Sequence, residues 1–98
     1  MNVNNKTIKQ ILDNILRDPI TELKGVSQVK EIRGNIKNNS REVSCEIFLS
    51  VVFGVKIPEV SWVVQKLALK ILEPIEDLDV KFINIHIVGV ELKEESNE

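Results

Sequence analysis

The chain has 98 residues, of which 43% are hydrophobic and 29% are charged, and its net charge at pH 7 is −2. This length and composition suit one globular domain and exclude an intrinsically disordered chain or a two-module enzyme. The single cysteine excludes an internal disulfide, and together with the single histidine it provides too few ligands for a tetrahedral zinc site. The near-neutral net charge argues against a dedicated nucleic-acid domain.

Neither a targeting segment nor a membrane span is expected. Residues 1–6 are polar and lack the apolar stretch of about 7–15 residues that a secretory signal needs. The longest apolar runs, such as 51–53 and 62–64, fall far short of the roughly 18 residues of a membrane-spanning helix. We therefore expect a cytoplasmic protein that forms a single domain over 1–98, with flexible tails at 1–5 and 93–98.

A first amphipathic helix is predicted near the N-terminus, because apolar residues recur at the spacing of one helical face. They are Ile8, Ile11, Leu12, Ile15 and Leu16. Asn5 or Thr7 is available as its N-terminal cap. At Asp18-Pro19 we expect a kink or a restart, because proline lacks the backbone donor of a helix interior, and the helix should run to about Lys24.

A β-hairpin is predicted next. Residues 29–37 alternate loosely, with Lys30 expected on the same side as Ile32 and Val29 on the polar side, which indicates an edge strand. The polar residues 38–40 predict a turn, and a regular alternation then predicts a second strand that ends before Gly54. Its inward residues are Val43, Cys45, Ile47, Leu49, Val51 and Phe53.

A second helix and a third strand complete the predicted elements. The helix should begin at Pro58 and end near residue 73, because Pro74 cannot continue it. Its apolar stripe consists of Val60, Val64, Leu67, Ala68, Ile71 and Ile75. The strand should span 80–92, with a bulge at Gly89. Its expected inner residues are Ile83, Ile85 and Ile87.

The order α-β-β-α-β predicts an α+β fold of two layers, with two helices on one face of a three-stranded mixed or antiparallel sheet. The other face of the sheet is too apolar for a wholly solvated surface. Its candidate interface residues are Phe48, Val52, Phe82, Asn84, His86 and Val88. Such a patch favours a homodimer or a larger assembly, and the alternative is that the first helix or the C-terminal tail covers this face.

Signals of catalysis are weak. His86 is the single imidazole and has no evident partner, and Cys45 on an inward strand face should have a raised pKa and little reactivity. The four glycines are isolated, so no phosphate-binding loop is present, and no serine stands in a nucleophile elbow. We therefore predict a protein that is not an enzyme, with no catalytic residue, metal or cofactor.

Two features of the second helix leave alternatives open. Trp62 lies one residue off the apolar stripe, which suits either a half-exposed anchor for a partner or packing against the first helix. Four lysines form a candidate basic patch that would bind phosphates, and a small RNA-binding module is therefore the alternative function. They are Lys56, Lys66, Lys70 and Lys81.

Two stretches between Glu42 and Val90 resemble the alkaline shock protein family, the envelope stress response proteins of Gram-positive bacteria. Residues 53–60, FGVKIPEV, are similar to the family's aromatic-Gly-Val-x-Ile-Pro-Glu-Val signature. Residues 83–90, INIHIVGV, are similar to its V-N-V-H-V-x-G-V strand. The Gly-Val pair after the first helix also fits the family, so the resemblance spans most of the chain.

The resemblance implies a non-enzymatic cytoplasmic protein of cell-envelope homeostasis. Some members of the family are held at the membrane by a separate anchor protein. We expect structural roles for the signature residues, because Gly54 permits a positive φ, Pro58 fixes the helix start and Glu59 favours the helix dipole. Gly89 belongs to the second stretch. The expected function is a scaffold that forms a homo-oligomer through the open sheet face and docks on a membrane-anchored or biosynthetic partner.

Overall fold

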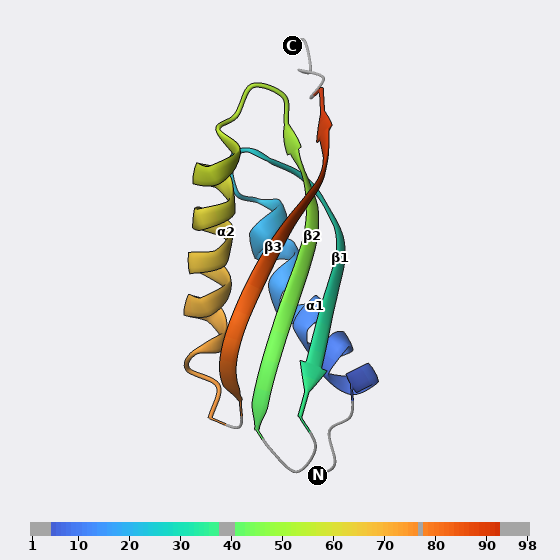
Figure 1. Cartoon of the computed structure of the whole chain (residues 1–98), viewed down its shortest axis with the longest axis vertical. Coiled ribbons are helices and arrows are strands. Elements are labelled where there is room, and N and C mark those ends of the chain that lie inside the picture. The colour runs from blue at the N-terminus through green and yellow to red at the C-terminus, as the bar shows by residue number, and fades with distance from the viewer. Residues whose placement is uncertain (1–4, 38–40, 77, 93–98) are drawn as a thin grey trace.

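A computed structural model describes residues 5–37, 41–76 and 78–92, which form two helices and one three-stranded sheet (Figure 1). The elements are α1 (Asn5–Thr21), β1 (Val26–Ile36), β2 (Glu42–Val52), α2 (Ile57–Leu72) and β3 (Asp79–Glu91). β2 lies in the centre, antiparallel to β1 and parallel to β3. In Figure 1, α1 crosses behind the sheet and α2 runs along its β3 side, which leaves the near face open. The predicted α+β order is confirmed, and the sheet is mixed.

The core lies between the sheet and the helices. Every second residue of β2 is fully buried there: Val43, Cys45, Ile47, Leu49 and Val51. Each helix adds residues spaced by four, namely Ile8, Leu12, Leu16 and Ile20 of α1 and Val64, Ala68 and Leu72 of α2. These two periods place each set on one face of its element, so the sequence pattern alone brings the core together.

α1 continues through Pro19, where the sequence predicted a kink or a restart. The helix ends at Thr21, two residues after the proline, so the hydrogen bond that proline cannot donate is one of the last of the helix. The Oγ1 of Thr21 donates to the carbonyl of Arg17 at 2.7 Å. The predicted break at Asp18-Pro19 and the predicted end near Lys24 are therefore wrong.

The predicted turn and tails fall largely outside the described residues. α1 begins at Asn5, the last residue of the predicted N-terminal tail, and Thr7 lies inside the helix rather than at its cap. Residues 1–4, 38–40 and 93–98 lie outside the described part of the chain, and the turn at 38–40 and the C-terminal tail lie there with them.

In β1, some side chains lie on the opposite face of the sheet from the one predicted. Its register against β2 shifts between Val26 and Gln28 and again between Val29 and Glu31. Consequently Val29 is buried in the core and Lys30 is exposed, the reverse of the faces expected for them. A bulge adds one residue to one strand, so a period-two count along the sequence changes face there.

The C-terminal ends of β2 and β3 lie side by side. β2 ends at Val52, so Phe53 leaves the core face on which it was predicted and is 69% exposed. Its backbone N–H donates to the carbonyl of Glu91 at 2.9 Å. The register of β2 against β3 shifts where Ser50 pairs with Gly89, which confirms the bulge expected at that glycine.

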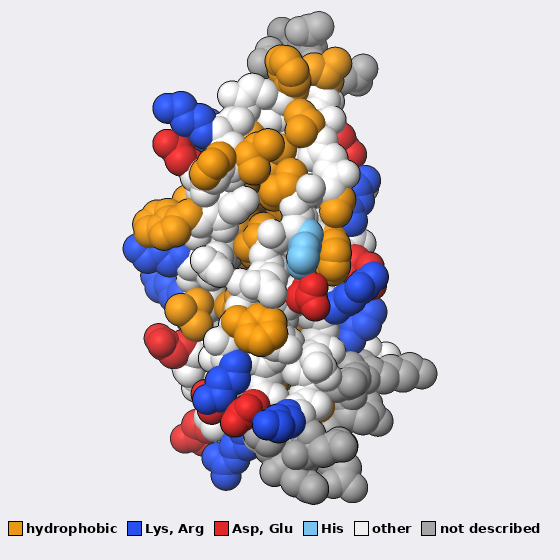
Figure 2. All heavy atoms as spheres, viewed as in Figure 1, with side chains coloured by type: hydrophobic (Ala, Val, Ile, Leu, Met, Phe, Trp, Pro, Cys, Tyr) orange, Lys and Arg blue, Asp and Glu red, His pale blue; other side chains and the backbone are white. Residues whose placement is uncertain are grey.

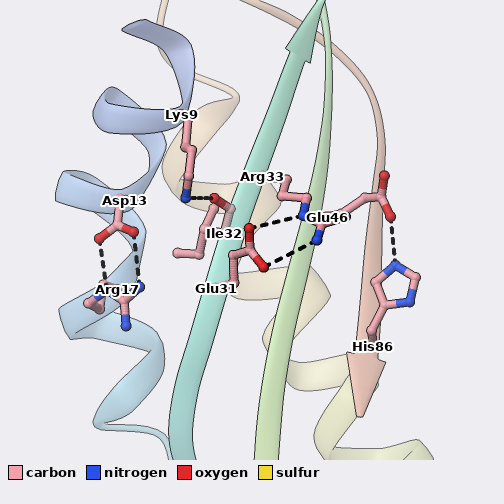
Figure 3. Close-up of polar contacts among 8 residues, drawn as sticks. All are labelled: Lys9, Asp13, Arg17, Glu31, Ile32, Arg33, Glu46 and His86. Atoms are coloured by element: carbon pink, nitrogen blue, oxygen red, sulfur yellow. Dashed lines mark hydrogen bonds and ion pairs between the residues drawn. The ribbon is translucent and has the colours of Figure 1, made fainter. Parts of the chain in front are cut away.

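α1 ties β1 down with two cationic side chains. The Nζ of Lys9 donates to the carbonyl of Ile32 at 2.9 Å, and Figure 3 shows that it arrives from the side of β1 away from β2. The Nη1 of Arg17 donates to the carbonyl of Val29 at 2.6 Å. Both carbonyls are occupied, so this edge of the sheet is protected against pairing with another strand.

Candidate functional site

A row of side chains crosses the middle of the open sheet face, which we call the open-face row. It consists of Glu31, Arg33, Glu46, Phe48 and His86. The strand registers bring them together, because Glu31, Phe48 and His86 are paired across the three strands. The rings of Phe48 and His86 stack with 4.4 Å between centroids and 10° between planes. The guanidinium of Arg33 lies over the Phe48 ring, 4.7 Å from its centroid.

An ion pair and a hydrogen bond hold the two ends of the open-face row (Figure 3). The Nε of Arg33 lies 3.0 Å from Oε2 of Glu31, and this bond holds the pKa of the Glu31 carboxyl below its usual range. The Nε2 of His86 lies 2.9 Å from Oε1 of Glu46. The aromatic stack is therefore flanked by Arg33 and Glu46, and each of these side chains already has a partner.

Exposed apolar side chains surround the open-face row. Figure 2 shows the single histidine in the middle of this face with hydrophobic side chains around it. Phe82 is 51% exposed and Val88 is 54% exposed, Asn84 is exposed and Val52 is half-buried. The strand registers place Phe48, Phe82, Asn84 and His86 on one open face, and Val88 lies at the register shift beside Gly89. The alternative in which the first helix covers this face is wrong, because α1 lies on the opposite side of the sheet.

A second polar cluster on the sheet was missed by the sequence reasoning. The Oγ of Ser27 lies 2.6 Å from Oε1 of Glu91, and the Nζ of Lys30 lies 3.3 Å from its Oε2. The hydrogen bond from Ser27, followed by that from Lys30, lowers the pKa of Glu91. These residues come from the two outer strands and reach across β2 beside the fully buried Ser50. No local motif joins residues so far apart in the chain.

A groove runs between α2 and β3. Its wider part, about 570 Å³, is lined by residues of both elements, among them Trp62, Leu69 and Phe82. A neighbouring part of about 480 Å³ also includes Trp62 and extends to Ile85 and His86 of β3. Trp62 is 59% exposed and lines the groove with residues of β3. Its role as an anchor for a partner stays a prediction.

The four predicted lysines do not share one hollow of the surface. Lys66 and Lys81 line the wider part of the groove, and Lys56 lines a separate hollow beside Gly25. The Nζ of Lys66 lies 4.6 Å from the centroid of the Trp62 ring, and Lys81 pairs with Asp79 at 3.1 Å. RNA binding by these lysines stays a prediction.

The signature residues adopt the backbone conformations expected of them. Gly54 has a φ of +96°, and a Cβ at this position would meet no atom within 4 Å, so the need for glycine is conformational. Pro58 and Glu59 lie in the first turn of α2. These residues shape the connection between β2 and α2.

Cys45 is fully buried in the central strand, and burial raises the pKa of its thiol to about 12. A thiol reacts as its thiolate, so we expect Cys45 in the native protein to resist an aromatic disulfide reagent at pH 8. Labelling should then follow unfolding and accelerate by several orders of magnitude in denaturant, since folded chains open rarely. Rapid stoichiometric labelling without denaturant, measured by absorbance, would contradict this burial.

The described residues show neither a metal cluster nor a membrane span. Within 5–37, 41–76 and 78–92, no three histidine, cysteine or carboxylate side chains are grouped as ligands of one ion. No helix within the same ranges combines the length and hydropathy needed to cross a bilayer.

Comparison with solved structures shows the same fold in the MamM C-terminal domain. A variant with three substitutions matches with a TM-score of 0.67 at 13% identity, covering 84% of this chain and 95% of that chain. Single-substitution variants match in a nickel form, with a TM-score of 0.60 at 15% identity over 87% and 99% of the two chains, and in a zinc form, with 0.59 at 10% over 85% and 87%. At these identities the similarity shows the fold alone.

Comparison with curated proteins gives no match. A family model does match, over residues 20–92, and it describes the alkaline shock protein 23 family, with a cell envelope-related function. The match takes in β1, β2, α2 and β3 together with both stretches that carry the sequence resemblance. The chain therefore belongs to the alkaline shock protein 23 family.

Proposed function

We propose that this protein is a non-enzymatic, cytoplasmic scaffold of the cell envelope that self-associates through the open face of its sheet. Family membership supports the envelope-related role. The observation that carries self-association is the exposed apolar surface around the open-face row, where Phe82 and Val88 are each about half exposed. Exposed apolar patches on a folded domain mark contact surfaces between proteins.

The chemistry of the open-face row suits an interface with a second copy. Aromatic residues and arginine are enriched where binding energy concentrates, and Arg33 and Phe48 already hold each other in place. A two-fold interface must be complementary to itself. This face carries both signs of charge, Arg33 on β1 and Glu46 on β2, so a rotated copy can set unlike charges opposite each other.

We assign the envelope link to contact with another protein, because the family has a cell envelope-related function. In this proposal a membrane-anchored or biosynthetic partner docks on a surface that remains free after the sheet faces pair.

Light scattering of the purified protein tests self-association. The chain mass is 11.2 kDa, and we expect the wild-type protein to scatter as a multiple of it. Phe82→Ser and Val88→Ser should each weaken association by about ten-fold or more, because each removes apolar area that the interface buries. Val63→Ser is the matched control, since Val63 is 41% exposed on α2 and away from this face. A monomeric wild-type protein, or face variants of unchanged mass, would refute the proposal.

A further inference from the structure

The free edge of β3 faces the groove beside α2. β3 pairs with β2 on its other side, and the Nε2 of Gln65 in α2 donates to the carbonyl of Ile83 at 2.6 Å. The N–H and C=O of one strand residue point to the same side of the strand, and this side alternates along the chain. Ile85, two residues further on, therefore also presents its N–H and C=O to the free edge, and Ile85 lines the groove.

The two edges of this sheet differ in the side chains that cover them. α1 blocks the edge of β1 with the charged side chains of Lys9 and Arg17. Along β3, residues 82–90 include no lysine, arginine, aspartate or glutamate, and the described residues place one neutral amide, that of Gln65, against the edge. An uncharged edge strand is a template for a further strand, and the Gln65 amide stands where the N–H of such a strand would stand.

The lining of the groove indicates which chain would enter it. Trp62, Leu69 and Phe82 offer apolar surface. The charged residues of the lining are both cations: Lys66 lies over the Trp62 ring, and Lys81 is paired with Asp79. Because α2 stands beside the edge, the groove admits one extended chain rather than the edge of a second sheet. Peptides that add a strand to an edge take their affinity from backbone hydrogen bonds and their specificity from alternate side chains.

We propose that the groove between α2 and β3 binds an extended segment of a partner protein as a fourth strand, and that this segment is acidic and carries a bulky apolar side chain. The cation of Lys66 complements the acidic residues, and Trp62 and Phe82 contact the apolar residue. Phe82 and His86 border both this site and the open face. The tests of the groove therefore change Ile85 and Lys66, which the self-association test leaves unchanged, so the two proposals can fail separately.

Selection of random short peptides displayed on phage, with the wild-type protein as bait, tests the proposal. We expect enrichment of sequences that combine aspartate or glutamate with large apolar residues. Ile85→Pro removes the edge donor at a position where an edge strand tolerates proline, and it should weaken binding of a selected synthetic peptide by about ten-fold. Lys66→Glu should also weaken binding, whereas Lys24→Glu, an exposed lysine outside the groove, should not.

Methylating the backbone nitrogens of the selected peptide provides a second test that needs no folded variant. Two peptides are compared, one methylated at the odd-numbered residues and the other at the even-numbered residues. One of them should bind about ten-fold more weakly and the other should bind normally, because a strand turns every second N–H toward its neighbour. The proposal would be overturned if no peptide were enriched, or if neither Ile85→Pro nor methylation of the peptide weakened binding. It would also be overturned if the protein formed an oligomer without peptide and Ile85→Pro abolished that oligomer, because the edge would then pair with a second copy.

Discussion

Replacing Leu12 with alanine is expected to lower the free energy of unfolding by about 2–5 kcal/mol, measured by urea denaturation. Leu12 is fully buried in α1, and its Cδ1 would lie 2.5 Å from a Cβ placed on Gly34 of β1. Removing the side chain leaves a cavity between this helix and the sheet. Domains of ordinary size have about 5–15 kcal/mol of stability in total, so the loss is a large fraction.

The contact between Leu12 and Gly34 can be tested by combining substitutions. Gly34→Ala alone should destabilise the fold by about 1–3 kcal/mol, because the added methyl group displaces the side chains of Leu12 and Ile8. In the variant that combines Gly34→Ala with Leu12→Ala, the added methyl group fills part of the cavity. The loss of unfolding free energy should therefore be about 1 kcal/mol smaller than the sum of the losses in the two single variants. Val64→Ala in α2 is the control, and its loss of unfolding free energy should simply add to that of Gly34→Ala. Additivity with Leu12→Ala would mean that α1 does not rest on Gly34.

Replacing Arg17 with methionine is expected to cost about 1–2 kcal/mol, because the carbonyl of Val29 and the carboxylate of Asp13 lose a charged donor that is partly exposed to solvent. Thermal and urea unfolding at neutral pH measure the loss. Arg33→Met is the matched control and should have a smaller effect, because the pair of Arg33 with Glu31 is exposed.

The effect of Arg17 should also depend on pH. The hydrogen bond from Arg17 lowers the pKa of Asp13, so this carboxylate contributes stability above the pKa of an unfolded aspartate. That contribution disappears as the pH falls through the lower pKa of the native state. The difference between wild type and Arg17→Met should therefore narrow in acid, and a difference that stays constant down to the acid transition would contradict the role of the Asp13 pair.

The direction of β3 relative to β2 follows from the helix that connects these two strands. The predicted order left the sheet mixed or antiparallel, whereas β3 is parallel to β2. A helix that connects two strands of one sheet carries the chain back to its starting end, which favours parallel strands. The helix at 57–72 between β2 and β3 was therefore sufficient evidence for the parallel pair.

The sequence by itself determined most of the residues that form the core and where most elements lie. β2 and α2 followed from periods of two and nearly four bounded by Gly54, Pro58 and Pro74, and these are local signals that the backbone obeys residue by residue. The family signature is likewise a local stretch of chain. For the same reason, the open face could be predicted from the residues of β2 and β3 that alternate with the core.

The tertiary structure alone decided how residues from different elements meet. The bulge before Glu31, the stack of Phe48 on His86, the contact of Ser27 with Glu91 and the cap of Gln65 on Ile83 each depend on strand register or on the placement of a helix against an edge. Register is set by the packing of the whole sheet, and a shift of one residue moves side chains to the other face. These contacts therefore have no signature in the local sequence, although they shape both surfaces proposed to bind partners.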